Sequence, residues 1–121
     1  MTRLWLAAAA LGGFLSVVPG AFDAHLAAGD ARAAELLRTG ALYGMVHAVA
    51  LTAVAAMAEP RGRPGLLLAI AGWGFAADLQ LFNLSLFGAD RGRVVRLGYA
   101  LRRGGLLIGW AALGLQASQR R

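Results

Sequence analysis

The sequence predicts an all-α integral membrane protein, a bundle of four membrane-spanning helices with a short amphipathic helix after the first span. Three observations lead to this fold class. Only 15% of the 121 residues are charged and 59% are apolar, whereas a soluble domain has about 25% charged residues. Four apolar runs follow one another, each close to the roughly 20 residues that a membrane-spanning helix needs. None of them shows the alternation of a membrane-spanning strand.

The first apolar run covers residues 4–22 and follows a short basic start that contains Arg3. Such a run is also typical of a secretory signal peptide, here with a cleavage site near Pro19-Gly20-Ala21. We interpret it as the first span.

The polar connection 23–39 comes next. Its apolar residues are spaced for a short amphipathic helix, and Asp30 is a candidate N-cap. Such a helix could lie on the membrane surface or cover the end of the bundle.

The remaining spans are predicted at 40–58, 66–88 and 98–117. Prolines and glycines in the segment 59–65 separate the second span from the third. Four spans use most of the chain, so residues 1–121 form a single membrane domain with no room for a soluble one.

The net charge of +6 comes from twelve arginines and six acidic residues. The arginines flank the apolar runs instead of forming one stripe, which indicates lipid headgroups and not nucleic acid as the partner. Their numbers on the two sides are similar, so the positive-inside rule does not decide the orientation. The start of the chain resembles a signal anchor and favours cytoplasmic ends.

Small residues four apart recur in each span, as expected where helix backbones approach closely in lipid. The sets are Gly12, Ser16 and Gly20; Gly40, Gly44 and Ala48; Gly74 and Asp78; and Gly105 and Gly109. The tryptophans Trp5, Trp73 and Trp110 are typical of interface anchors or packing residues.

Several motifs appear in a characteristic order. They are Gly20-Ala21-Phe22-Asp23-Ala24-His25, Tyr43-Gly44-Met45-Val46-His47-Ala48-Val49-Ala50-Leu51, Ala71-Gly72-Trp73, Leu81-Phe82-Asn83-Leu84-Ser85-Leu86-Phe87, and Gly104-Gly105 before Gly109-Trp110. Over nearly the whole chain this pattern resembles domain of unknown function family 423, the uncharacterised family that includes transmembrane protein 256. The resemblance implies a four-helix protein of the bacterial inner membrane, and it implies no activity.

The chain departs from that family pattern at charged and polar positions. Asp23 and Asp78 stand where glycine is usual, and Asn83 with Leu84 replaces a Ser-Gly pair. Arg102 and Arg103 stand where a proline and an apolar residue are usual. Set against the family, this member has gained charge inside its bundle, which suggests a specialised role.

Asp78 lies near the middle of the third span, where an aspartate costs about 2.5–3.5 kcal/mol of insertion free energy. It should therefore face protein, water or a partner. We predict a structural ion pair with Arg102 or Arg103. A proton or ligand site and a contact with a partner subunit are the alternatives.

His47 lies about two turns into the second span, with Tyr43 one turn earlier on the same face. We predict a buried neutral imidazole that is hydrogen-bonded across helices, with Asn83, Ser85 or the segment near His25 as partner. Haem ligation by the two histidines is the alternative. Two histidines without further ligands are too few for a typical zinc site, so we expect no metal and no cofactor.

The absence of cysteine removes disulfides, thiolate ligands and cysteine nucleophiles. No serine has a credible base and acid around it, so we expect no enzyme. A structural or accessory subunit of a larger membrane complex is the preferred function. A small oligomeric transporter or channel with Asp78 on a polar path is the first alternative, and a histidine-ligated cofactor protein is the second. Candidate partner contacts are His25, Asp23, Arg91, Arg93 and Arg96.

Overall fold

The computed structural model describes residues 1–26, 31–61, 64–87 and 107–119. Its helices are α1 (Thr2–Leu26), α2 (Ala31–Ala58), the single 3₁₀ turn η1 (Glu59–Arg61), α3 (Leu66–Phe87) and a C-terminal helix (Leu107–Ser118). The described ranges contain no strand. The all-α class with four helices is therefore confirmed.

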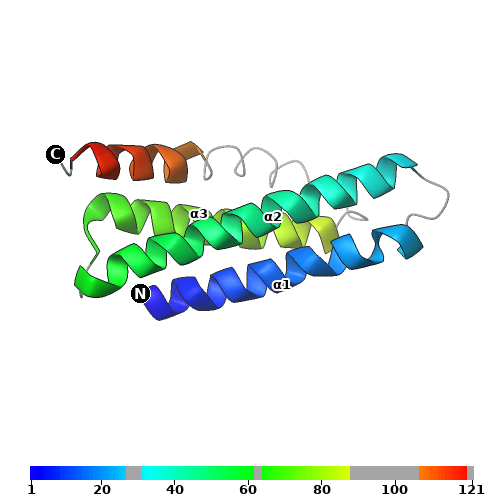
Figure 1. Cartoon of the computed structure of the whole chain (residues 1–121), viewed down its shortest axis with the longest axis horizontal. Coiled ribbons are helices and arrows are strands. Elements are labelled where there is room, and N and C mark those ends of the chain that lie inside the picture. The colour runs from blue at the N-terminus through cyan, green and yellow to red at the C-terminus, as the bar shows by residue number, and fades with distance from the viewer. Residues whose placement is uncertain (27–30, 62–63, 88–106, 120–121) are drawn as a thin grey trace.

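The helices lie lengthwise beside one another (Figure 1). α1 packs against α2 and α3, and α2 packs against α3. The start of α1, the end of α2, the start of α3 and the end of the C-terminal helix lie at one end of the bundle, and the end of α1 and the start of α2 lie at the other (Figure 1). We call these the terminal end and the α1–α2 end.

The turn at the terminal end follows from proline and glycine chemistry. Pro60 lies in η1, directly after α2 ends at Ala58. Pro64 and Gly65 precede α3, and the amide of Ala69 donates to the carbonyl of Gly65 at 2.9 Å. A glycine is acceptable at this capping position, where its carbonyl accepts the first hydrogen bond of the helix.

The predicted short amphipathic helix is not a separate element. α2 is one continuous helix of 28 residues from Ala31, so residues 31–39 form its first turns. The predicted boundary at Thr39-Gly40 contains no proline, and Gly40 is buried within the helix. A single glycine costs only about 1 kcal/mol relative to alanine, which is too little to end a helix that packs along its length. The candidate N-cap Asp30 lies outside the described residues.

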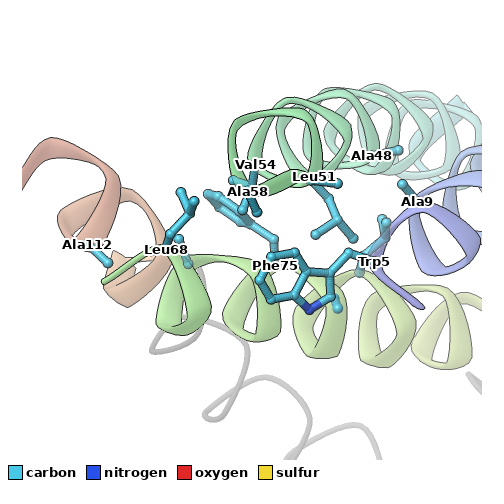
Figure 2. Packing of buried hydrophobic residues seen from close by; sticks show 13 residues of the cluster. Trp5, Ala9, Ala48, Leu51, Val54, Ala58, Leu68, Phe75 and Ala112 are labelled. Carbon is cyan, nitrogen blue, oxygen red and sulfur yellow. The ribbon is translucent and has the colours of Figure 1, made fainter. Parts of the chain in front are cut away.

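The core between the helices is built from a few large side chains and many small ones. Trp5, Leu51, Val54 and Phe75 are fully buried, and they meet at the centre of the cluster in Figure 2. Among the described residues, eight of the fifteen buried hydrophobic ones are alanines. Most large hydrophobic residues in the same part of the chain lie on the outside, where nineteen are exposed. Small residues inside and large apolar residues outside are the reverse of a soluble helical bundle.

Glycine allows the closest helix contacts. A Cβ atom on Gly44 of α2 would lie 2.8 Å from the Cβ atom of Ser16 on α1. A Cβ atom on Gly72 of α3 would lie 2.5 Å from the indole ring of Trp5. A Cβ atom on Gly12 of α1 would likewise collide with the side chain of Leu79 on α3. Gly12, Ser16 and Gly44, which the spacing of small residues had singled out, therefore lie at helix contacts.

One helical stretch, Leu37–Ala58 of α2, is long and apolar enough to cross a membrane. The other apolar stretches among the residues searched are Thr2–Val18, Leu66–Phe82 and Leu107–Ser118, and they are shorter. The fourth span was predicted at 98–117, and its part before Leu107 lies outside the described residues.

Candidate functional site

His47 is buried in α2, with 7% of its surface exposed. Its Nδ1 atom lies 2.6 Å from the carbonyl oxygen of Tyr43, one turn earlier in the same helix. Because a carbonyl can only accept, Nδ1 carries the proton that is donated. In the neutral ring the Nε2 lone pair is then the group that can accept a hydrogen bond or bind a ligand.

The imidazole is surrounded by aromatic rings from three helices. The ring centroid of His47 lies 6.4 Å from that of Tyr43, 6.0 Å from that of Phe75 on α3, and 6.4 Å from that of Trp110 on the C-terminal helix. Phe75 and Trp110 also contact each other edge to face at 5.2 Å. We call these four residues the His47 cluster. It joins the C-terminal helix to α2 and α3.

The described hydrogen bond of His47 stays within α2, and its described ring contact on α3 is with Phe75, two turns away from Asn83. The side chains of the predicted partners Asn83, Ser85 and His25 lie outside the described part of the structure, so a bond from Nε2 across helices stays a prediction. Intrahelical bonding is favoured because the carbonyl one turn earlier is within reach of Nδ1 without any rearrangement. Tyr43 was predicted to be a buried polar residue, but it is 56% exposed. Its side chain is largely exposed, but its ring stacks beside that of His47 at 6.4 Å, and its backbone carbonyl accepts the hydrogen bond from His47.

Asp78 lies in the interior of α3, with 5% of its surface exposed. The antiparallel register sets its depth. Gly44 lies level with Phe82, and the ring of His47 contacts Phe75. Asp78 lies between these two levels, so the buried carboxylate and the imidazole are at similar depths in the bundle. Its predicted partners Arg102 and Arg103 lie outside the described residues, and the ion pair stays a prediction.

The other predicted site residues are placed only in part. Asp23 and His25 belong to the last turns of α1, and Asn83 belongs to α3. The side chains of these three residues lie outside the described part of the structure. Arg91, Arg93 and Arg96 fall wholly outside it.

Three polar or aromatic contacts were not anticipated from the sequence. The Nε2 atom of Gln80 on α3 donates to the carbonyl of Ala8 on α1 at 3.0 Å. The hydroxyl of Ser16, fully buried, donates to the carbonyl of Gly12 at 2.7 Å. Trp5 is fully buried and contacts Trp73 edge to face at 6.1 Å. A glutamine inside an apolar run, such as Gln80, is itself a signal for an interhelical hydrogen bond.

The described side chains around His47 pack closely against one another. No group of three or more His, Cys, Asp or Glu residues in the described part of the chain is arranged to hold a metal ion. The ring of His47 is enclosed by carbon-rich neighbours.

The fold and the site define a small all-helical protein that has one helix able to cross a membrane and a histidine and an aspartate buried within its bundle. The chain belongs to the family described as protein of unknown function (DUF423), whose model matches residues 19–100. This confirms the family indicated by the sequence motifs. Neither the curated proteins nor the solved structures provide a match.

Proposed function

We propose that the chain is a multi-pass membrane protein whose four helices all lie in the bilayer. The observation that carries this proposal is the distribution of residue sizes. Nineteen large hydrophobic residues are exposed among the described residues, and of these Phe14 is 67% and Val49 is 70% exposed. Soluble monomers rarely expose contiguous apolar patches beyond a few hundred Å². Lipid, in contrast, solvates such a surface at no cost.

The helix lengths support the same proposal. The 25 residues of α1 and the 22 residues of α3 correspond to about 37 and 33 Å at 1.5 Å per residue. The hydrocarbon core of a bilayer is about 30 Å thick. Both α1 and α3 are therefore long enough to cross the hydrocarbon core.

The absence of cysteine makes this topology directly testable. Single cysteines at Glu59 and Ser118 should react with a membrane-impermeant maleimide from one side, and a cysteine at Ala31 from the other. All three positions are exposed and lie near helix ends. A cysteine at Val49, in the middle of α2, should be protected in intact membranes and should react after denaturation. Full labelling of Val49→Cys in membranes would contradict the proposal.

In a bacterium, the membrane would be the cytoplasmic one, with both chain ends inside. The start of α1 and the end of the C-terminal helix lie at the same end of the bundle, which supports placing both on one side of the membrane (Figure 1). The basic start of the chain, which resembles a signal anchor, favours the cytoplasmic side. The same labelling experiment, performed on whole cells and on inverted vesicles, determines which side carries Glu59 and Ser118.

Within the membrane, the proposed role is that of a non-enzymatic structural or accessory subunit of a larger complex. Trp5, Leu51, Phe75 and Leu79 fill the space between α1, α2 and α3, which supports a packing role over a conducting path. The arginines of the segment 91–103 suit an acidic partner face or anionic headgroups.

Purification from native membranes in mild detergent tests the role. A stoichiometric larger partner is the expected result. The competing function is transport by a homo-oligomer, and the burial of Asp78 is the observation that favours it. Recovery only as a monomer or homo-oligomer, together with solute flux in liposomes that Asp78→Asn abolishes, would replace the subunit proposal with transport.

A further inference from the structure

A groove of about 750 Å³ lies between α1 and α2 at the α1–α2 end of the bundle. Its outer part is lined by Glu35, Arg38 and Thr39 of α2. Its inner part is lined by Val17 of α1 and by Leu42 and Met45 of α2, together with smaller residues. The groove therefore changes from charged to apolar along the helix axis, and we call it the α1–α2 groove.

The groove changes from charged to apolar in the same direction as a bilayer does from its headgroups to its hydrocarbon core. The apolar stretch of α2 that can cross a membrane begins at Leu37, so Arg38 and Thr39 lie at its edge and Glu35 lies just outside. Met45 is seven residues beyond Arg38, which corresponds to about 10 Å along a helix. An amphiphile in this groove would hold its headgroup at Arg38 and its chain against Met45.

The outer part of the groove carries one negative and one positive side chain, Glu35 and Arg38. Glu35 and Arg38 are three residues apart, so they project from the same face of α2. A guanidinium suits a phosphate because it donates parallel hydrogen bonds to two oxygens, and the hydroxyl of Thr39 can donate a further one. The carboxylate of Glu35 suits an ammonium group. A headgroup with a phosphate and a primary ammonium a few ångströms apart complements both side chains.

We propose that the α1–α2 groove binds the zwitterionic lipid phosphatidylethanolamine. Its phosphate contacts Arg38 and Thr39, its ammonium contacts Glu35, and one acyl chain lies along Val17, Leu42 and Met45. This inference rests on the proposed membrane location and adds a ligand of stated chemistry. Phosphatidylglycerol would satisfy Arg38 but would leave the carboxylate of Glu35 beside an anionic lipid with no cation, and so it should bind more weakly.

Native mass spectrometry of the protein, released from nanodiscs that contain equal amounts of the two lipids, tests the proposal. The wild-type chain should retain one phosphatidylethanolamine in preference to phosphatidylglycerol. Glu35→Gln should reduce that preference roughly tenfold, the size of one charge-assisted hydrogen bond. Arg38→Gln should weaken the retention of both lipids. The matched controls are Glu59→Gln and Arg3→Gln at the terminal end, which should leave retention unchanged.

Two results would overturn the lipid site. One is equal retention of the two lipids by the wild-type chain. The other is an unchanged preference in Glu35→Gln, which is expected if Glu35 and Arg38 pair only with each other or if a protein segment fills the groove. Circular dichroism of each variant checks that the helices are intact.

Protection of Val49→Cys from labelling is measured in the same nanodiscs. If this protection holds while the lipid preference fails, only the lipid site is wrong. Loss of protection rejects the membrane location as well.

Discussion

At the residue scale, the packing of this protein depends on positions where even one methyl group does not fit. Gly44 faces Ser16 across the α1–α2 contact, and the hydroxyl of Ser16 is held by the carbonyl of Gly12. Ser16 is fully buried, so its side chain cannot move to the outside of the bundle. The interior tolerates no added atom here because neither backbone can move without disturbing the rest of its helix.

Gly44→Ala should therefore lower the unfolding free energy in detergent by about 1–3 kcal/mol, the usual cost of overpacking. The loss should shrink in a Ser16→Gly background, because the colliding side chain is then absent. Gly114→Ala is the matched control. No atom lies within 4 Å of a Cβ at that position, and alanine is the better helix former by up to about 1 kcal/mol. Equal effects at Gly44 and Gly114 would contradict this account.

The buried carboxylate of Asp78 gives a second prediction at this scale. If Arg102 or Arg103 pairs with it, Asp78→Asn should lower stability by about 3–5 kcal/mol, because the arginine is left uncompensated. Neutralising both arginines in the same chain should restore much of the loss. Thermal unfolding in detergent measures both effects. An unchanged midpoint in Asp78→Asn would show that the pair does not exist.

At the element scale, each helix contact combines apolar packing with a small number of polar or aromatic links. The contact between α1 and α3 has the hydrogen bond from Gln80 to Ala8 and the edge-to-face pair of Trp5 and Trp73. The C-terminal helix is joined to the others through Trp110 in the His47 cluster. These links fix which faces of the helices meet.

Gln80→Leu tests the polar link between α1 and α3. The variant keeps an apolar side chain of similar size but removes the donor, and interhelical hydrogen bonds in membranes average about 0.6 kcal/mol. We expect a loss of this size in a denaturation assay that resolves small differences. Gln119→Leu makes the same chemical change at an exposed position after the C-terminal helix and should be neutral. A larger loss at Gln119 than at Gln80 would rule out a stabilising role for the bond.

The sequence predicted the existence of these elements better than their orientation about their own axes. The start of α3, for example, is clear from the sequence, because Pro64 and Gly65 directly precede its apolar run. Along the apolar stretches of these helices both faces are apolar, however, so hydrophobicity does not distinguish the face that packs inside from the face that lies outside. For this reason the His47 cluster could not be derived, because it depends on the rotation of three helices at once. The continuous α2 was missed because Arg32, Glu35 and Arg38 resemble the polar face of a separate surface helix.

At the scale of the whole molecule, the described bundle has mostly small residues inside and large apolar residues outside. Alanines line the contacts between helices, and the larger apolar side chains point away from them. Figure 2 shows how few large residues occupy the centre. Such a molecule is stable only where its exterior is solvated by lipid or covered by other apolar surfaces.

Val49→Asp distinguishes a lipid-facing exterior from a water-facing one. Val49 is 70% exposed near the middle of α2. In water the change would be close to neutral, within about 0.5 kcal/mol. In a bilayer an aspartate at the centre of a span costs about 2.5–3.5 kcal/mol, so we expect a clear drop in the fraction that is inserted. Ser118→Asp, at an exposed helix end, is the control and should insert normally. Normal insertion of Val49→Asp would argue against the bilayer as the solvent of this face.

The size-sorted interior also determines how this family is free to vary over evolution. At an outward position such as Val49, leucine, isoleucine or phenylalanine meets the same requirement, so relatives should exchange these residues readily. At Gly44, Gly72 or Ala48 the requirement is a small volume, and the permitted residues are few. Divergence should therefore be greatest on the outer face and least in the interior. Because the outer residues exchange among one hydrophobic class, relatives whose sequences look distant should still share the spacing of their glycines and alanines.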